Sequence, residues 1–349
     1  MALFARQRTF EVDMLARIIA QHQHLFRHHT LAERMCLGQP LPVKAIELGA
    51  RGSGMPTVLF VGGIHGVERI GSQVVLSFLS SLLKRLDWDV HLQQLLQKVR
   101  IAFVPIANPV GVFKGTRGNG NNVDLMRNAP LSAIEPVTFM VGGQSVSKHL
   151  PWYRGQGDTE LETQVLIDYV QRLIDSSSSL ISLDVHSGFG LLDHLWFPNA
   201  YTKAPFAGAA YVQYLKQLFD AGYPHHSYYQ CAPQSQFYRT HGDLWDYIYQ
   251  QNMPASVDAG NRGSSLPKLV PLTLEMGSWA WVKKNPRQVF NFHGYFNPQQ
   301  RHRHQRILRR HITLMQFLLD AACSEVLEKM PNSAFEQYRQ QAHAKWYKR

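Results

Sequence analysis

The sequence is poor in cysteine, in acidic residues and in long hydrophobic runs, and each shortage argues against a class of protein. Cys36, Cys231 and Cys323 are the only three cysteines among 349 residues, and their odd number and scattered positions predict neither a disulfide framework nor a cysteine-based metal site. No apolar run approaches the length that spans a bilayer. The first residues carry charges throughout and no continuous apolar core, so no signal peptide is indicated and we expect a cytoplasmic protein.

Acidic residues are outnumbered, with 25 against 36 basic residues and a net charge of +11. A basic surface attracts nucleic acid, anionic lipid or acidic substrates. Much of the excess lies near the C-terminus, in residues 301–311 and 345–349, and no nucleic-acid-binding motif accompanies it. We therefore interpret the excess as a solvated helix face and a basic tail, and we expect neither nucleic acid nor a membrane as a partner.

Apolar residues, by contrast, are plentiful and regularly spaced, at 45% of the chain. Their spacing predicts helices at 10–28, 67–83, 159–175, 205–220 and 301–325. Apolar runs predict strands at 43–49, 57–63, 98–109, 179–188 and 269–277. This alternation predicts an α/β fold, with a central, mostly parallel or mixed twisted sheet and helices on both faces. We expect a single domain over residues 1–330, including the N-terminal helix, and a polar basic tail over 331–349.

Chemically active side chains follow three of the predicted strands, and in α/β folds such side chains gather at the carboxyl ends of strands. His65 and Glu68 stand three residues apart where a strand gives way to a helix, so both side chains can reach one ion. His186 ends another buried strand and should emerge at the same sheet edge. Two histidines and one glutamate leave a fourth tetrahedral position for water, which is the usual form of a catalytic zinc site.

Glu275 lies near the end of the apolar strand at 269–277. A carboxylate in such a strand is costly unless it finds a partner from elsewhere in the fold. One interpretation is a pair with a neighbouring arginine or lysine. The functional interpretation is a general base that takes a proton from water and passes it to a leaving group.

The order of these motifs resembles that of the zinc carboxypeptidases. The H-x-x-E of residues 65–68 is followed by Asn108-Pro109, by "RGNGNNVDLMRNAP" at 117–130, by His186-Ser187 and by "LTLE" at 272–275. The closest local similarity is to the branch that contains carboxypeptidase T-like and murein-peptide amidase enzymes. The resemblance implies the carboxypeptidase A-like, or phosphorylase/hydrolase-like, α/β fold and a catalytic domain that binds one Zn2+.

The resemblance also implies roles for individual residues. His65, Glu68 and His186 match the zinc ligands, and Glu275 matches the catalytic glutamate. Four further positions match functional residues of the family. They are Asp124, which accepts a hydrogen bond from the first ligand histidine; Arg117, which polarises the scissile carbonyl and stabilises the oxyanion; Arg127, which binds the substrate carboxylate; and Tyr238, a mobile tyrosine at the site.

Two departures from the family pattern bear on the substrate. The family has asparagine immediately before the carboxylate-binding arginine, and this chain has Met126. The change puts in doubt that the protein captures a free C-terminus. It bears less on whether the protein hydrolyses an amide bond. In addition, residues 252–265 resemble an inserted loop that could reshape the pocket.

The resemblance implies a zinc metallopeptidase that cleaves an amide bond next to a carboxylate-bearing group, in murein-type or other small peptides. Three alternatives stay open. One is an N-acyl amino acid deacylase of the succinylglutamate desuccinylase or aspartoacylase type, which shares the fold and an H-x-x-E…H site. The others are a non-catalytic binding protein on the same scaffold and nucleic-acid binding through the basic excess.

Overall fold

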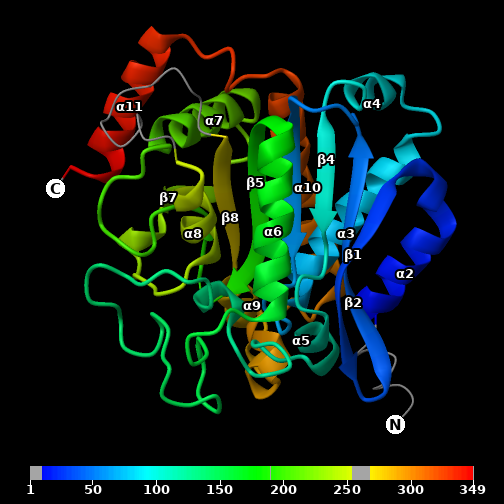
Figure 1. Cartoon of the computed structure of the whole chain (residues 1–349), viewed down its shortest axis with the longest axis vertical. Helices are drawn as coiled ribbons and strands as arrows, with labels where there is room; N and C mark the ends of the chain where they lie inside the picture. Colours follow the sequence, from blue (N-terminus) through cyan, green and yellow to red (C-terminus); the bar gives the residue numbers. More distant parts are fainter. Residues whose placement is uncertain (1–9, 189, 254–267, 349) are drawn as a thin grey trace.

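The computed structural model describes residues 10–188, 190–253 and 268–348. The expected inserted loop at 252–265 lies almost wholly outside the described residues. The expected fold class is confirmed, because the described chain forms one mixed eight-stranded sheet with helices on both faces (Figure 1).

The sheet has the order β1-β2-β4-β3-β5-β8-β6-β7. The strands are β1 Arg27–Cys36, β2 Gln39–Gly49, β3 Met55–Gly62, β4 Arg100–Val104, β5 Ser177–Gly188, β6 Asp193–Phe197, β7 Tyr229–Pro233 and β8 Leu269–Gly277. Strands β4, β3, β5 and β8 form a parallel centre, while β1, β2 and β6 pair antiparallel with their inner neighbours. The four central strands therefore end at one sheet edge, the lower edge in Figure 1.

Helices cover the two faces of this sheet. They are α2 Phe10–His22, α3 Arg69–Arg85, α4 Val90–Leu95, α5 Pro109–Lys114, α6 Leu161–Ser176, α7 Ala209–Gly222, α8 Leu244–Gln251, α9 Trp279–Lys284, α10 Arg301–Cys323 and α11 Asn332–Trp346. Helix α6 lies in front of the sheet in Figure 1, and α3 and α10 lie behind it. The central strands are buried on both faces as a result, which explains their continuous apolar sequence. None of the described helices is long and apolar enough to cross a membrane.

The N-terminal segment departs from the expected helix at 10–28. The helix α2 ends at His22, and a strand, β1, begins at Arg27. This strand pairs only with β2 at the sheet edge, and most of its residues are exposed or half-buried. It therefore lacks the apolar run by which a buried strand is recognised.

The segment expected to be a polar basic tail, residues 331–349, contains the helix α11. It packs against α7, where the rings of Phe335 and Tyr211 lie 5.2 Å apart, and Trp346 donates a hydrogen bond to the Cys231 carbonyl (2.9 Å). A few buried apolar residues thus anchor a helix whose composition is mainly polar. The expected boundary at residue 330, between a single domain and a tail, stays a prediction.

The turn between β3 and α3 packs directly on the backbone of α5. A Cβ atom on Gly66 would lie 1.8 Å from the carbonyl carbon of Gly111 and 2.2 Å from the nitrogen of Val112. Only a residue without a side chain permits this approach. The glycine therefore fixes the position of the turn that carries the candidate site.

We expect Gly66→Ala to lower the free energy of unfolding by about 1–3 kcal/mol or more, because the added methyl must displace backbone rather than a flexible side chain. Gly52→Ala is the matched control, since its Cβ would meet only the Met55 side chain at 3.8 Å. Denaturant unfolding of both variants measures the difference. Equal stabilities for the two variants would contradict this packing.

Candidate active site

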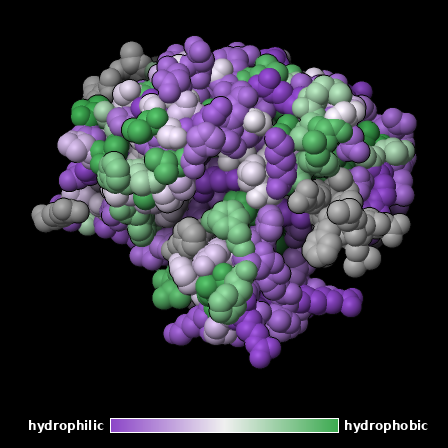
Figure 2. Space-filling view, turned by 90° about the horizontal axis from the view of Figure 1, so that it is seen from below, coloured by the Kyte–Doolittle hydropathy of each residue, from purple (hydrophilic) through white to green (hydrophobic). Residues whose placement is uncertain are grey.

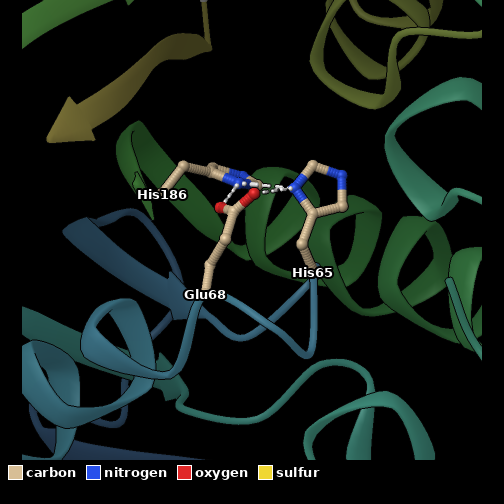
Figure 3. Close-up of side chains that lie close together, drawn as sticks. All are labelled: His65, Glu68 and His186. Carbon is tan, nitrogen blue, oxygen red and sulfur yellow. Dashed lines mark hydrogen bonds and ion pairs between the residues drawn. The ribbon is translucent and has the colours of Figure 1, made fainter. Parts of the chain in front are cut away.

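The parallel sheet centre brings two of the three expected metal ligands to adjacent strand ends. His65 follows β3 in the turn, and Glu68 is the residue immediately before α3. His186 lies near the end of β5, which pairs with β3 so that Gly62 stands opposite Val185. All three side chains are buried, and they point toward one another (Figure 3).

The donor atoms of this cluster are spaced as a metal ion requires. Nδ1 of His65 lies 3.1 Å from Nδ1 of His186, and the two Glu68 carboxylate oxygens lie 2.9 and 3.0 Å from these nitrogens. A tetrahedral zinc with bonds of about 2.0–2.1 Å holds its donors roughly 3.3 Å apart. The two nitrogens and the carboxylate therefore fit a zinc ion, and they form a cluster that could hold one.

Carboxylates on the far side of each imidazole orient both rings. His65 donates from Nε2 to Asp124 Oδ1 (2.9 Å), and His186 donates from Nε2 to Asp184 Oδ2 (2.7 Å). With its proton held on Nε2, each ring presents the Nδ1 lone pair to the centre of the cluster. Such partners fix the tautomer of a ligand histidine and raise its basicity.

The cluster strongly favours ionised carboxylates. Burial alone raises the pKa of Glu68, but the rings of His65 and His186 outweigh this effect and hold the pKa far below its usual range. Burial also raises the pKa of Asp124. The Arg117 guanidinium and His65 outweigh this effect and bring the pKa of Asp124 well below its ordinary value. Negative charge is therefore present at the cluster across the neutral pH range.

Arg117 joins the two carboxylates of this cluster. Its Nε donates to Asp124 Oδ2 (2.8 Å) and its Nη1 donates to Glu68 Oε1 (3.2 Å). The guanidinium lies at the cavity wall beside Trp152, 6.0 Å from the ring centroid. Its remaining N–H donors are available to an oxygen atom in the cavity.

Glu275 stands beside the cluster, because β8 pairs with β5 so that Glu275 lies opposite His186. Burial raises the pKa of Glu275 to about 8, and the Glu68 carboxylate contributes in the same direction. Gly188 makes room for the carboxylate, since a Cβ there would lie 2.3 Å from Glu275 Oε1. The His186 ring when it is protonated, and the Arg117 guanidinium, counteract the rise.

Arg127 is a buried cation that has no acidic partner within 4 Å among the described residues. It is 3% exposed, and its guanidinium donates to two backbone carbonyls, those of Val141 (3.3 Å) and Met126 (3.2 Å). Its planar fork suits a carboxylate. Met126, also buried, lines the same cavity.

The cluster, both arginines and Glu275 line one cavity of about 440 Å3. Figure 2 looks onto this edge of the sheet and shows a hydrophilic hollow near the centre of the view, with hydrophobic side chains on its rim. Tyr238 lies on the cavity wall, where the Arg127 guanidinium is 5.8 Å from its ring centroid. Every site residue expected from the sequence is thus in this cavity or, like Asp124, directly behind it.

An aromatic wall completes the cavity, and apart from Tyr238 its members were not expected from the sequence. It consists of His194, Trp196, Phe237 and Tyr238, whose neighbouring ring centroids are 4.8–5.8 Å apart. His194 and Trp196 come from the strand β6, which is too short to be predicted from an apolar run in the sequence. Alternation along that strand places both rings on one sheet face.

Asp184 is the other residue that sequence reasoning missed. Its Oδ2 accepts hydrogen bonds from His186 and from Trp245 Nε1 (2.9 Å), and its side chain is fully buried. A signal was present, because residues two apart on a strand share a face and Asp184 stands two before His186. In the sequence, Asp184 was interpreted only as one residue of an apolar strand and not as a partner of His186.

We expect Asp184→Asn to weaken zinc binding by about tenfold to a hundredfold, because an amide holds the His186 tautomer less firmly than a carboxylate does. Competitive titration against a zinc chelator measures the affinity. Asp246→Asn is the matched control, since this aspartate is equally buried but accepts from the backbone of Ala200 and Tyr201. An unchanged zinc affinity in Asp184→Asn would show that the contact is only structural.

The sequence is similar to those of known carboxypeptidases over part of its length. The chain is 35% identical over 91 residues to carboxypeptidase D of Anas platyrhynchos, which is 24% of this chain and 7% of that protein. It is 29% identical over 149 residues to the carboxypeptidase N catalytic chain of Homo sapiens, covering 38% and 31% of the two chains. The chain therefore spans only a small part of the length of these relatives.

Solved structures match over more of the chain. The crystal structure of thrombin activatable fibrinolysis inhibitor matches with a TM-score of 0.63 at 16% identity, covering 90% of this chain and 72% of that one. Carboxypeptidase A from Helicoverpa armigera matches with a TM-score of 0.61 at 15% identity and the same coverage. Both likenesses show the shared fold.

The model of the zinc carboxypeptidase family matches residues 14–277, a stretch that contains the whole cluster and Glu275. Because this match covers most of the chain, the protein belongs to the zinc carboxypeptidase family.

Proposed function

We propose that the protein is a zinc-dependent hydrolase that cleaves an amide bond next to a carboxylate-bearing group. One observation carries the proposal: His65, Glu68 and His186 meet in one cavity with the carboxyl group of Glu275 and with the buried guanidinium of Arg127, which has no ion pair among the described residues. Family membership supports the metal and the class of reaction. A cytoplasmic location remains a prediction.

A bound zinc ion supplies Lewis-acid chemistry, because it polarises a carbonyl and acidifies water. Glu275 accepts the proton of the attacking water and then donates it to the departing amine. The position of Glu275 opposite His186 places this base beside the cluster. The free N–H donors of Arg117 stabilise the negative charge that develops on the carbonyl oxygen.

The opposite end of the cavity holds the substrate in place. Arg127 binds the substrate carboxylate, because no acidic side chain among the described residues competes for its guanidinium. Tyr238, beside Arg127, closes this side of the site. Gln234 also lines the cavity, and its side-chain amide makes no hydrogen bond to the described residues. This amide can therefore bind a polar substrate group in place of the family asparagine.

The lining favours a substrate with an uncharged side chain. The aromatic wall offers a large apolar surface, and rings of this kind pack well against aromatic or aliphatic groups. Among the described lining residues the acidic ones are Glu68 and Glu275, and both belong to the catalytic centre. A basic side chain would lack a counter-ion of its own.

Met126 favours the N-acyl amino acid deacylase as a second candidate. A thioether cannot hold a terminal carboxylate as the asparagine amide does. A substrate whose carboxylate is bound by Arg127 alone, such as a succinyl- or acetyl-amino acid, suits this cavity as well. Small peptides, including murein-type peptides, remain the first candidate because of family membership.

We expect Glu275→Gln to lower kcat by about a hundredfold to ten-thousandfold, because the amide cannot carry the proton. Zinc content should stay that of the wild type, since Glu275 is outside the ligand cluster. Removal of zinc with a chelator should abolish hydrolysis, and readdition should restore it. The assay uses peptides with a free C-terminal carboxylate, the same peptides amidated, murein peptides and N-acyl amino acids.

Glu33→Gln is the matched control, because this glutamate is exposed on β1 and distant in sequence from the cluster. Free-carboxylate peptides should be cleaved and amidated ones spared if Arg127 anchors the substrate. Hydrolysis of N-acyl amino acids but not of peptides would favour the deacylase. Wild-type turnover in Glu275→Gln would refute the mechanism, and inactivity of the zinc-loaded wild type on the whole panel would favour a binding protein.

We expect Met126→Asn to raise kcat/KM for free-carboxylate peptides by about tenfold or more, because the amide adds a hydrogen bond to a charged group. The amidated peptides should show no such gain. Met126→Leu is the control, since it preserves apolar volume. If the asparagine variant behaves like the leucine variant on both peptide sets, Met126 does not determine carboxylate capture.

A further inference from the structure

A second cavity, of about 370 Å3, lies on the other side of the β5–β6 connection from the catalytic cavity. Gly188 and Gly190 line the catalytic cavity, while Leu191, Leu192 and Asp193 line the second one. Its remaining walls come mainly from α9, at the lower end of the molecule in Figure 1, and from α10 behind the sheet. No residue is shared between the two described linings, so the cavities are separate.

Positive charge dominates the lining of this second cavity. Lys284, Arg303, Arg306 and Arg310 face a single carboxylate, Asp193. Four cations against one anion leave an excess of three positive charges, before any contribution from His302, which also lines the cavity.

Two of the arginines are held in fixed positions. Arg310 donates to Asp193 (2.7 Å) and stacks 4.0 Å above the ring centroid of Tyr228. Arg303 donates to the carbonyls of Trp281 (2.9 Å) and Lys284 (3.2 Å). Such contacts leave part of each guanidinium fork free, and they remove part of the entropy cost of binding a ligand.

The other two cations form no ion pair with the described residues. Within the described ranges, neither Lys284 nor Arg306 has a carboxylate within 4 Å, and both side chains are exposed. Their charges are therefore available to a ligand.

The start of α10 makes this arrangement costly without an anion. The amino end of a helix carries partial positive charge and favours acidic residues. Here the first turn contains no acidic residue, and Arg301, His302, Arg303 and His304 follow one another. A bound anion would relieve both the mutual repulsion and the conflict with the helix dipole.

We propose that this second cavity binds a small molecule that carries two or more phosphate groups. One phosphate group brings about 1.5–2 negative charges, so two match the excess of three. Arginine forks suit phosphate oxygens. The apolar walls of Leu191, Leu192 and Trp281 suit a compact non-polar portion of the ligand. Hydrolysis in the catalytic cavity is not required for this binding.

The test is calorimetric titration of the zinc-loaded full chain with inorganic pyrophosphate, and with orthophosphate for comparison, at about 0.15 M ionic strength. Pyrophosphate should bind more tightly than orthophosphate. The double variant Lys284→Glu with Arg306→Glu should weaken pyrophosphate binding by about tenfold or more, because two attractive contacts become repulsive. Zinc content is measured before and after the titration.

The matched control is Lys283→Glu with Arg309→Glu. Lys283 and Arg309 are exposed on the same two helices as Lys284 and Arg306, and the net charge changes equally, but neither lines the cavity. The control should bind as the wild type does. Equal weakening in both double variants would overturn the proposal in favour of a diffuse basic field, and no weakening in either would place the anion elsewhere, such as at Arg127. Absence of pyrophosphate binding to the wild type would also overturn it.

Discussion

Two imidazole nitrogens face each other at 3.1 Å at the carboxyl ends of the central strands, and the rest of the site depends on that approach. Two ring lone pairs at this distance repel each other unless a shared proton or a cation stands between them. Asp124 and Asp184 hold the far side of each ring, and the Glu68 carboxylate completes a set of donors that a cation would join. The sheet supplies the geometry, since neighbouring parallel strands deliver the rings to one edge.

The charges around this centre come close to balance only when a divalent cation is counted. Glu68, Asp124 and Asp184 contact the two imidazoles and Glu275 lies beside them, whereas Arg117 is the guanidinium that contacts two of these carboxylates. A divalent cation held by His65, Glu68 and His186 would offset the remaining negative charge. The raised pKa of Glu275 has burial as its main cause, and the nearby Glu68 carboxylate adds to the rise.

The sequence made the catalytic core predictable because its residues stand where strands stop. An H-x-x-E after an apolar run, a histidine after another and a glutamate after a third fall at one edge whenever the strands are parallel. The order of these motifs carried enough information to recognise the family. Arg117, Arg127 and Tyr238 were predictable only through that resemblance, because an isolated arginine or tyrosine has no pattern of its own.

Other features escaped prediction for physical reasons. Strand β1 is an edge strand with little burial, and β6 is short, so neither shows a clear apolar period. Helix α11 depends on a few tertiary contacts, such as that of Trp346, rather than on its own mainly polar composition. The basic cavity joins residues of α9 and α10 to the β5–β6 connection, so its concentration of charge exists only in the folded chain.

The distance along the chain between the two ligand histidines has a consequence for biosynthesis. His65 is made 121 residues before His186, and the strand that carries the latter must dock beside β3 before the two rings can meet. A ribosome-bound fragment that ends earlier offers only the H-x-x-E pair, which holds a metal weakly. A metal ion held by all three ligands would therefore bind tightly only after the central strands of the polypeptide have assembled.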